Sequence, residues 1–366
     1  SLSRPLDRRN ARSRLHGRGL TRMIEGLVEP TASGTATMLS TRQLRFIVAA
    51  LFVVGLSLAH GQPPGKTLRV GVLLSGSEAQ WSHFDDEVVA GLREKGFVEG
   101  RNLVVVRRYG GLKLDRITDS AAELAGMELD AIVTSCSNTT RAAMSVTKST
   151  PIVMAGVADP VAIGLVKTLA NPGGNVTGVS GLLADMEPKR VELLSRLVPE
   201  RSRIGVLMNS TNPLHEAHWQ RAEAAARSMN LTAVRIAARG PAGIDAALDE
   251  LARANVKGLL VLSDDPMNIE FRHRIAAAAA RLRLPSVGSS RVYAEDGGLI
   301  SYGGDTSDGF RKSAEYVAKI ANGARAAELP IEQPTRLPLV INLRTATALE
   351  IAIPRELLLR ADELIQ

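Results

Sequence analysis

Short apolar runs alternate with amphipathic stretches along the chain from about residue 66 onward. The runs 68–74, 130–134 and 152–157 are rich in Val, Ile and Leu, which is typical of strands buried on both faces of a sheet. Between them, residues 114–125 repeat apolar positions at helical spacing. Strands that alternate with helices of this length predict βαβ units, so the expected fold class is α/β with parallel sheets.

The same alternation occurs a second time after residue 183. Two successive sets of four or five strands predict two similar Rossmann-like lobes. Gly and Pro gather near Ser180, Gly304 and Thr335, where we expect the chain to cross between the lobes. The predicted lobes are residues 66–183 plus about 305–335 and residues 184–304 plus about 336–366.

Residues 150–181 hold the most distinctive pattern. A buried strand runs into the polar loop around Asp159, and apolar residues at 163–170 then recur at helical spacing, which predicts a helix. A second strand is expected at 176–181. Elsewhere, a helix is predicted over 84–95, with Trp81 in the polar loop before it.

Polar residues follow most of the predicted strands. In open α/β sheets, ligands bind at the carboxyl ends of the strands, so these residues are candidates for a ligand site, although Ser, Asn and Asp also cap helices. A helix beginning near Ser135 offers free N–H groups to a carboxylate or phosphate, while an aspartate can accept a hydrogen bond from an amine. Tyr302 is either a wall of the site or a core residue. The candidates are Ser75, Gly76, Ser135, Ser137, Asn138, Thr139, Asp159, Asn209, Asp264 and Tyr302.

Motifs for catalysis are missing from the sequence. There is no G-x-S-x-G elbow, Walker phosphate loop, H-E-x-x-H or G-x-G-x-x-G. His215 and His218 share a helix face that should be exposed to solvent, but no third metal ligand is apparent, and the single Cys136 excludes a cysteine-based zinc cluster. We therefore expect neither an enzyme nor a bound cofactor or metal.

The positive charge is concentrated at the N-terminus. Of the net charge of +7, residues 1–37 carry +4 and residues 38–61 carry +2, which leaves +1 for residues 62–366. A nearly neutral body argues against a nucleic-acid surface.

The first 61 residues are interpreted as two segments. Residues 38–61 begin with Met38 and two arginines, followed by a 14-residue apolar run from Phe46 to Ala59. That run is shorter than the roughly 20 residues of a membrane helix, so a secretory signal peptide is expected, with a retained anchor as the alternative. No cysteine lies near the end of the apolar run, so a lipid anchor is not expected. Residues 1–37 are either a disordered leader or upstream of the true translation start.

Residues 66–366 resemble the ABC-transporter substrate-binding proteins that include tryptophan- and tyrosine-binding members. The segments that carry the resemblance are LRVGVLLSG (68–76), GLREKGFVEGRNL (91–103), TPIVMAGVADPVAIGLVKTLANPGGNVTG (150–178), GGLISYGGD (297–305) and LPLVINLRTATALEIAIPRELLLRADELI (337–365).

The resemblance implies a periplasmic-binding-protein-like fold with two Rossmann-like lobes and a three-strand hinge. The loops at Ser75, 137–139, Asp159, Asn209 and Asp264 would then face the cleft between the lobes. The loop 75–83 departs from those of the amino-acid-binding members, and residues 263–266 match them only in part.

The resulting hypothesis is an exported, periplasmic solute-binding protein that captures an amino acid or related small molecule by hinge closure. Its partners would be an ABC permease and its ATPase, with no nucleic acid, and the protein would be a monomer. The alternatives are a ligand-sensing domain of a signalling system and an enzyme on the same scaffold.

Overall fold

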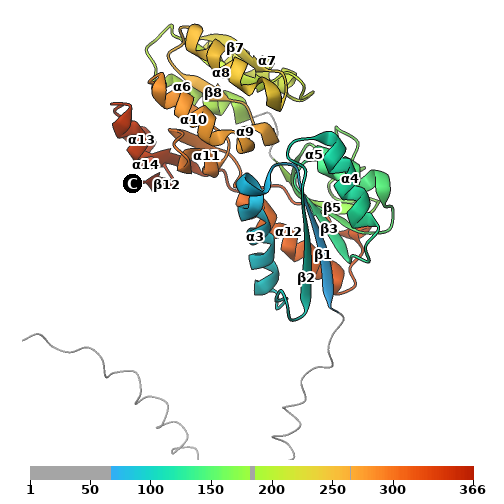
Figure 1. Cartoon of the computed structure of the whole chain (residues 1–366). Coiled ribbons are helices and arrows are strands. Elements are labelled where there is room, and N and C mark those ends of the chain that lie inside the picture. Colours follow the sequence, from blue (N-terminus) through green and yellow to red (C-terminus); the bar gives the residue numbers. More distant parts are fainter. Residues whose placement is uncertain (1–66, 182–185, 264) are drawn as a thin grey trace, which may run out of the picture. The chain divides into compact units, whose positions relative to one another are not determined.

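The computed structural model describes residues 67–181, 186–263 and 265–366. Residues 64–366 form one compact unit (Figure 1). The predicted leader (1–37), the predicted signal segment (38–61) and Asp264 lie outside the described residues. Within the described part of the chain, no helix is both long and apolar enough to cross a membrane.

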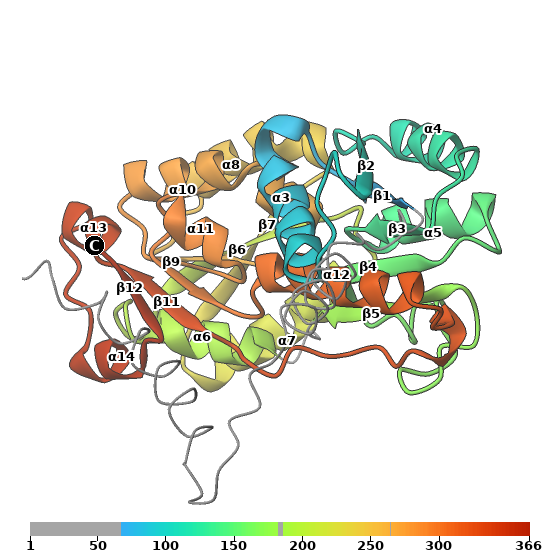
Figure 2. The same ribbon diagram turned by 90° about the horizontal axis from the view of Figure 1, so that it is seen from below.

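The first sheet has five parallel strands in the order β2-β1-β3-β4-β5. Its strands are β1 (Leu68–Leu74), β2 (Leu103–Tyr109), β3 (Ala131–Thr134), β4 (Ile152–Ala158) and β5 (Val176–Gly181). Its helices are α3 (Glu78–Glu94), α4 (Leu114–Ala125), α5 (Ser137–Val146) and α12 (Thr306–Ala321). Although α12 comes from much later in the sequence, it packs beside α3 against this sheet (Figure 2), and Phe310, Ala314 and Val317 of α12 share a core with Val70 and Val72 of β1.

The second sheet has seven strands in the order β12-β11-β10-β9-β8-β6-β7. Only the β10–β11 pair is antiparallel among the pairs formed by the described residues. Its strands are β6 (Arg203–Asn209), β7 (Thr232–Ala238), β8 (Leu259–Val261), β9 (Ser286–Gly288), β10 (Ile300–Tyr302), β11 (Leu339–Asn342) and β12 (Glu363–Ile365). Its helices are α6 (Glu187–Ser195), α7 (His215–Ser228), α8 (Ile244–Arg253), α9 (Pro266–Glu270), α10 (Arg272–Arg281), α11 (Arg291–Glu295), α13 (Leu343–Ala348) and α14 (Arg355–Arg360), with short 3-10 turns η2 (Pro241–Gly243) and η3 (Ala326–Glu328) elsewhere in the chain.

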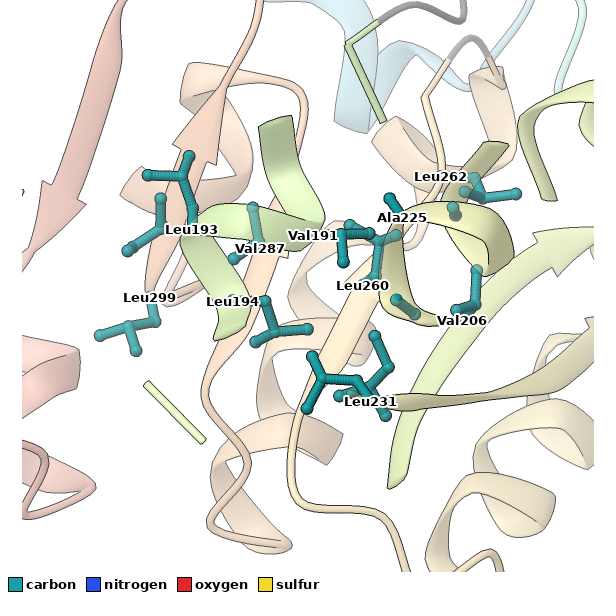
Figure 3. Packing of buried hydrophobic residues seen from close by; sticks show 14 of the residues in the cluster. Val191, Leu193, Leu194, Val206, Ala225, Leu231, Leu260, Leu262, Val287 and Leu299 are labelled. Carbon is teal, nitrogen blue, oxygen red and sulfur yellow. The ribbon is translucent and has the colours of Figure 1, made fainter. Parts of the chain in front are cut away.

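Helices cover both faces of the second sheet. Because side chains alternate across a strand, Val206 of β6 joins a core with Leu194 of α6, while the neighbouring Leu207 joins a core with Leu248 of α8. Figure 3 shows Val191, Leu193 and Leu194 of α6 among the buried side chains of the first of these cores.

The chain passes between the two sheets at three places. It leaves the first sheet between β5 and α6, returns between β10 and α12, and leaves again between η3 and β11. The third passage runs alongside β5, because Ser180 N donates to Glu332 O at 2.8 Å and Glu332 N donates to Gly178 O at 3.1 Å. The third passage therefore lies beside the strand after which the chain first leaves the first sheet.

Two predicted helices differ from the structure. The predicted helix at 163–170 is wrong: these residues form turns, because Gly164 takes a φ of 72° that interrupts helical geometry. The helix predicted to begin at Phe84 begins at Glu78 instead. Trp81 therefore lies in α3 and is buried, and its predicted place in a polar loop is wrong.

Candidate ligand site

A cavity of about 880 Å³ lies at the carboxyl ends of strands from both sheets. Parallel strands bring their carboxyl ends to one edge, so the loops after β1, β3 and β4 meet there, as do those after β6, β8 and β9. The volume falls within the roughly 300–1,000 Å³ of small-molecule pockets. Among the polar and charged residues that line it are Ser75, Ser135, Ser137, Asn138, Arg141, Arg190, Asn209, Asn212, Ser263, Asp265, Asn268, Ser289 and Ser290.

Five of the residues predicted from the sequence lie around this cavity. They come from both sheets and are Ser75, Ser135, Ser137, Asn138 and Asn209. The ends of β1 and β3 are joined directly, because Ser75 N donates to Ser135 Oγ at 3.0 Å. The structure thus brings these polar strand ends together at one place.

The other predicted residues lie elsewhere or serve the backbone. Thr139 is buried, and its Oγ1 accepts from the N–H groups of Ser135 and Cys136 at 3.1 and 3.0 Å. Asp159 holds a tight turn, with a φ of 38° and its Oδ1 accepting from Ala162 N at 3.1 Å. Tyr302 packs against the core of the second sheet. None of these three lines the cavity formed by the described residues, and Asp264 lies outside those residues.

Gly76 lies directly over the indole of Trp81. A Cβ added at Gly76 would come within 1.9 Å of Trp81 Nε1. The Gly76 carbonyl accepts from Gly111 N at 2.9 Å, which ties the first loop to the chain that follows β2. Gly76 is not itself a cavity-lining residue among those described, but it allows Trp81 to reach the cavity wall.

The N-terminus of α5 faces the cavity through Ser137 and Asn138. Thr139 and Cys136 form a capping box that fixes this end of the helix. The first turn of α5 holds no acidic residue. The positive end of the helix dipole is therefore not offset by a carboxylate on its own first turn, which favours an anionic group in the cavity.

The histidine pair considered as a metal candidate belongs to the core. His215 and His218 are 0% and 3% exposed, so the predicted solvent-facing position is wrong. His215 Nδ1 accepts from Asn209 N at 2.8 Å and its Nε2 donates to Ser263 O at 2.8 Å. Burial lowers the pKa of His215, which agrees with a neutral ring making these two contacts. Among the residues described, no three His, Cys, Asp or Glu side chains are arranged to hold a metal ion.

Asn209, Asn212 and Asp265 line one part of the cavity, here called the cavity floor, and His215 holds the backbone of Asn209 in place. Asn209, whose backbone it holds, donates through Nδ2 to Asp265 Oδ2 at 2.9 Å, and Asn212 Nδ2 contacts the same oxygen at 2.9 Å. Asp265 Oδ1 accepts from Met267 N at 2.8 Å and caps α9. Asp265 therefore positions two amide side chains that line the cavity.

A buried ion pair lies behind this floor. Glu187 Oε1 accepts from Arg190 Nη1 at 2.8 Å and from the backbone and hydroxyl of Ser263 at 3.1 and 2.7 Å, and His218 Nδ1 lies 3.1 Å away. Burial alone raises the pKa of Glu187, but the Arg190 charge and the bonds from His218 and Ser263 outweigh burial and lower the pKa to about 2. Arg190 lines the cavity and donates through Nε to the Tyr302 carbonyl at 2.7 Å.

Comparison with known proteins identifies the family to which this chain belongs. The family model of the ABC transporter substrate binding protein matches residues 71–365. The chain belongs to this family. The match covers both sheets and every loop around the cavity, and the periplasmic-binding-protein-like fold expected from the sequence is confirmed.

Relatives of this substrate-binding protein include amino-acid binders. A tyrosine-binding protein of Clostridioides difficile is 24% identical over 262 residues, covering 72% of this chain and 75% of that protein. A crystal structure of an ABC domain in complex with L-Trp from Streptococcus pneumonia is 25% identical, with a TM-score of 0.72, and covers 82% of this chain and all of that one. A conserved domain protein of Vibrio cholerae is 28% identical, with a TM-score of 0.74 and the same coverage.

Several cavity residues of this substrate-binding protein were missed by the sequence analysis. Arg190 was not singled out, because it lies in no motif and its role depends on contacts with distant segments. Asp265 lies in the polar run 263–266 after β8, from which only Asp264 was chosen as a candidate. The spacing of Glu187 and Arg190 at i, i+3 in the first turn of a helix was an available signal. Asn268 was missed because α9 was not predicted as a separate helix.

Proposed function

We propose that this chain is the exported solute-binding protein of an ABC importer, and that it captures an amino acid or related small molecule in the cavity. The observation that carries this proposal is the meeting of polar strand ends from two sheets around one cavity of about 880 Å³. Membership of a family of substrate-binding proteins supports binding rather than catalysis as the function. The names of two relatives, which specify tyrosine and L-Trp, support an amino acid as the solute.

The ligand's carboxylate would bind beside the N-terminus of α5. The N–H groups of Ser137 and Asn138 begin that helix, and the side chains of Ser75 and Ser135 lie at the adjoining strand ends. Hydrogen bonds from backbone N–H groups to a carboxylate are charge-assisted and strong.

The ligand's ammonium group would bind the opposite wall at Asn268. Asn268 Nδ2 donates to Leu262 O at 2.5 Å, and because a carbonyl only accepts, this bond fixes the orientation of the amide. Oδ1 is then an acceptor, and it is buried with no hydrogen-bond partner among the described residues. A zwitterion satisfies both walls of the cavity.

Ligand capture would proceed by hinge closure about the three passages between the sheets. In this proposal residues 66–183 plus about 305–335 form one lobe, and 184–304 plus about 336–366 form the other. A ligand that contacts both lobes stabilises the closed arrangement by its differential affinity for it. Small-angle scattering should then give a smaller radius of gyration with ligand than without it, and an unchanged radius would contradict closure.

The remaining parts of the proposal concern location and partners. Export would use residues 38–61 as a signal peptide and deliver a monomer to the periplasm. There it would pass its solute to an ABC permease driven by an ATPase. The family supports work with ABC transporter components.

Thermal unfolding of residues 62–366 with a panel of ligands tests the proposed function. The panel contains the twenty L-amino acids, including L-tyrosine and L-tryptophan, together with tyramine and tryptamine, which lack the carboxylate. Binding to the folded state alone adds about 2.7 kcal/mol of stability at a ligand concentration of 100 Kd. We expect one or a few amino acids to raise Tm and their decarboxylated analogues not to. A panel without any shift would contradict the proposal.

A further inference from the structure

Trp81 forms part of the cavity wall next to the loop 75–77, which follows β1. Its indole is only 1% exposed but borders the cavity. The ring packs edge-on against Phe84, with centroids 5.3 Å apart, and Phe84 stacks on Phe310 at 4.8 Å. These contacts, together with Gly76 above the ring, hold the indole in one orientation.

The indole nitrogen of Trp81 is a buried donor that nothing in the described protein satisfies. Nε1 has no hydrogen-bond partner among the residues that the structure describes. An indole N–H can only donate. Leaving a buried polar group unpaired costs free energy, so the group favours a ligand atom that accepts.

A second unsatisfied polar group, the hydroxyl of Ser75, lies directly after the strand β1. Ser75 is 2% exposed, and its Oγ lacks a partner within the described residues. Its backbone is already engaged, because Ser75 N donates to Ser135 Oγ and Ser75 O accepts from Leu112 N at 2.7 Å. Ser75 and Trp81 both line the cavity, so the two unpaired buried atoms belong to residues that border it.

We propose that Trp81 Nε1 and Ser75 Oγ form a donor pair that binds an acceptor oxygen of the ligand and determines specificity at this end of the cavity. The pair selects a carboxylate or carbonyl oxygen and excludes an ammonium group, which would place donors against the indole N–H. This inference deepens the proposed function and rests on the cavity being the ligand site. It assigns a binding role to Trp81, in the loop-and-helix segment where the sequence departs from amino-acid-binding members.

Indole NMR tests the donor pair without knowledge of the natural ligand. The sequence contains two tryptophans, Trp81 and Trp219, so a ¹⁵N-labelled sample gives two indole N–H signals, and Trp219→Phe assigns them. Trp219 lies in the core of the second sheet and is not a cavity-lining residue among those described. The probes are sodium acetate, methylammonium chloride and sodium chloride at matched ionic strength.

We expect acetate to shift the Trp81 signal in a saturable way, while methylammonium and chloride leave it in place and Trp219 responds to none of them. Ser75→Ala removes one donor without touching the indole and should raise the acetate concentration needed for half-saturation. A Trp81 signal that ignores acetate, or that moves equally with methylammonium, would overturn the donor pair.

Substitution separates this inference from the proposed function. For any amino acid that raises Tm, Trp81→Phe keeps the ring contact with Phe84 but loses the N–H. We expect its Kd to rise by about 5- to 150-fold, which corresponds to about 1–3 kcal/mol for an unmade bond, whereas Trp219→Phe should leave Kd unchanged. Equal affinity in Trp81→Phe and wild type would refute the role of Trp81 while leaving the proposed function standing.

Discussion

The carboxylate of Glu187 makes several polar contacts that no motif in the sequence predicts. One carboxylate oxygen accepts from Arg190 and from both polar groups of Ser263, beside His218. These partners come from α6, α7 and the end of β8. The ion pair therefore holds the cavity floor to the helix that follows the first passage between the sheets.

Removing this charge should destabilise the protein. Glu187→Gln keeps the shape of the side chain but leaves Arg190 as a buried cation without its counter-charge, and breaking a buried pair costs about 3–5 kcal/mol. Urea unfolding at neutral pH measures this loss. Glu192→Gln on the same helix is the control, because its partly exposed pair with Lys189 should contribute at most about 1 kcal/mol.

The same pair predicts how stability depends on pH. The pKa of Glu187 falls from 4.5 to about 2 on folding, so the folded state favours the ionised form. Its contribution is complete above 4.5 and is lost as pH falls through 4.5 towards 2. The difference in free energy of unfolding between wild type and Glu187→Gln should therefore shrink over that range, and a difference independent of pH would contradict the assignment.

At the scale of elements, α3 and the loop before it form one packed unit. Ser77, the N-cap residue, donates through its backbone N and its Oγ to Glu270 of α9 at 2.9 and 2.6 Å. Gly76 makes room for Trp81 one turn into the helix. The start of α3 is thus set by contacts with a helix of the other sheet as well as by its own sequence.

Gly76→Ala should disturb this unit. The added methyl group would meet the indole of Trp81 at 1.9 Å, and overpacking of this kind costs about 1–3 kcal/mol. Gly174→Ala is a matched control, because an added Cβ there meets nothing within 4 Å and should change stability by no more than about 0.5 kcal/mol. Thermal unfolding compares the two, and equal Tm values would show that the indole does not lie where the structure places it.

The start of α3 also shows why some elements escape prediction. Apolar periodicity becomes clear only at Phe84, so the helix predicted from the sequence begins six residues too late. Ser77 followed by Glu78 was the available N-terminal signal. The prediction for residues 163–170 was wrong in the opposite way. Apolar spacing predicted a helix, but these residues form turns around Gly164, in which Leu165 and Val166 are still buried.

At the scale of the whole molecule, the α/β class and the family were predicted from the sequence. The buried strands could be recognised from the sequence because their apolar runs are a local pattern. The positions of Ser75, Ser137 and Asn209 at the cavity could be predicted because the carboxyl ends of parallel strands lie at one edge of a sheet. Arg190 could not be found this way. Its position depends on Glu187, whose own contact with Ser263 joins residues that are 76 positions apart.

The two-sheet arrangement gives the solute contacts from segments far apart in sequence. Residues that directly follow β1 and β3 line one side of the cavity, and residues at the ends of β6 and β8 line the other. A ligand that contacts both sides favours the arrangement in which both sets of contacts are made, by its differential affinity for that arrangement. This is the physical basis of the capture by closure that we propose.

The most direct test of solute capture is native mass spectrometry of the protein as purified from cells, followed by unfolding and identification of what is released. We predict one small molecule per chain that carries both a carboxylate and an amino group. The released compound, added back to the refolded protein, should raise Tm. A stoichiometric ligand without a carboxylate, or a protein that carries nothing and binds no amino acid after refolding, would contradict the account.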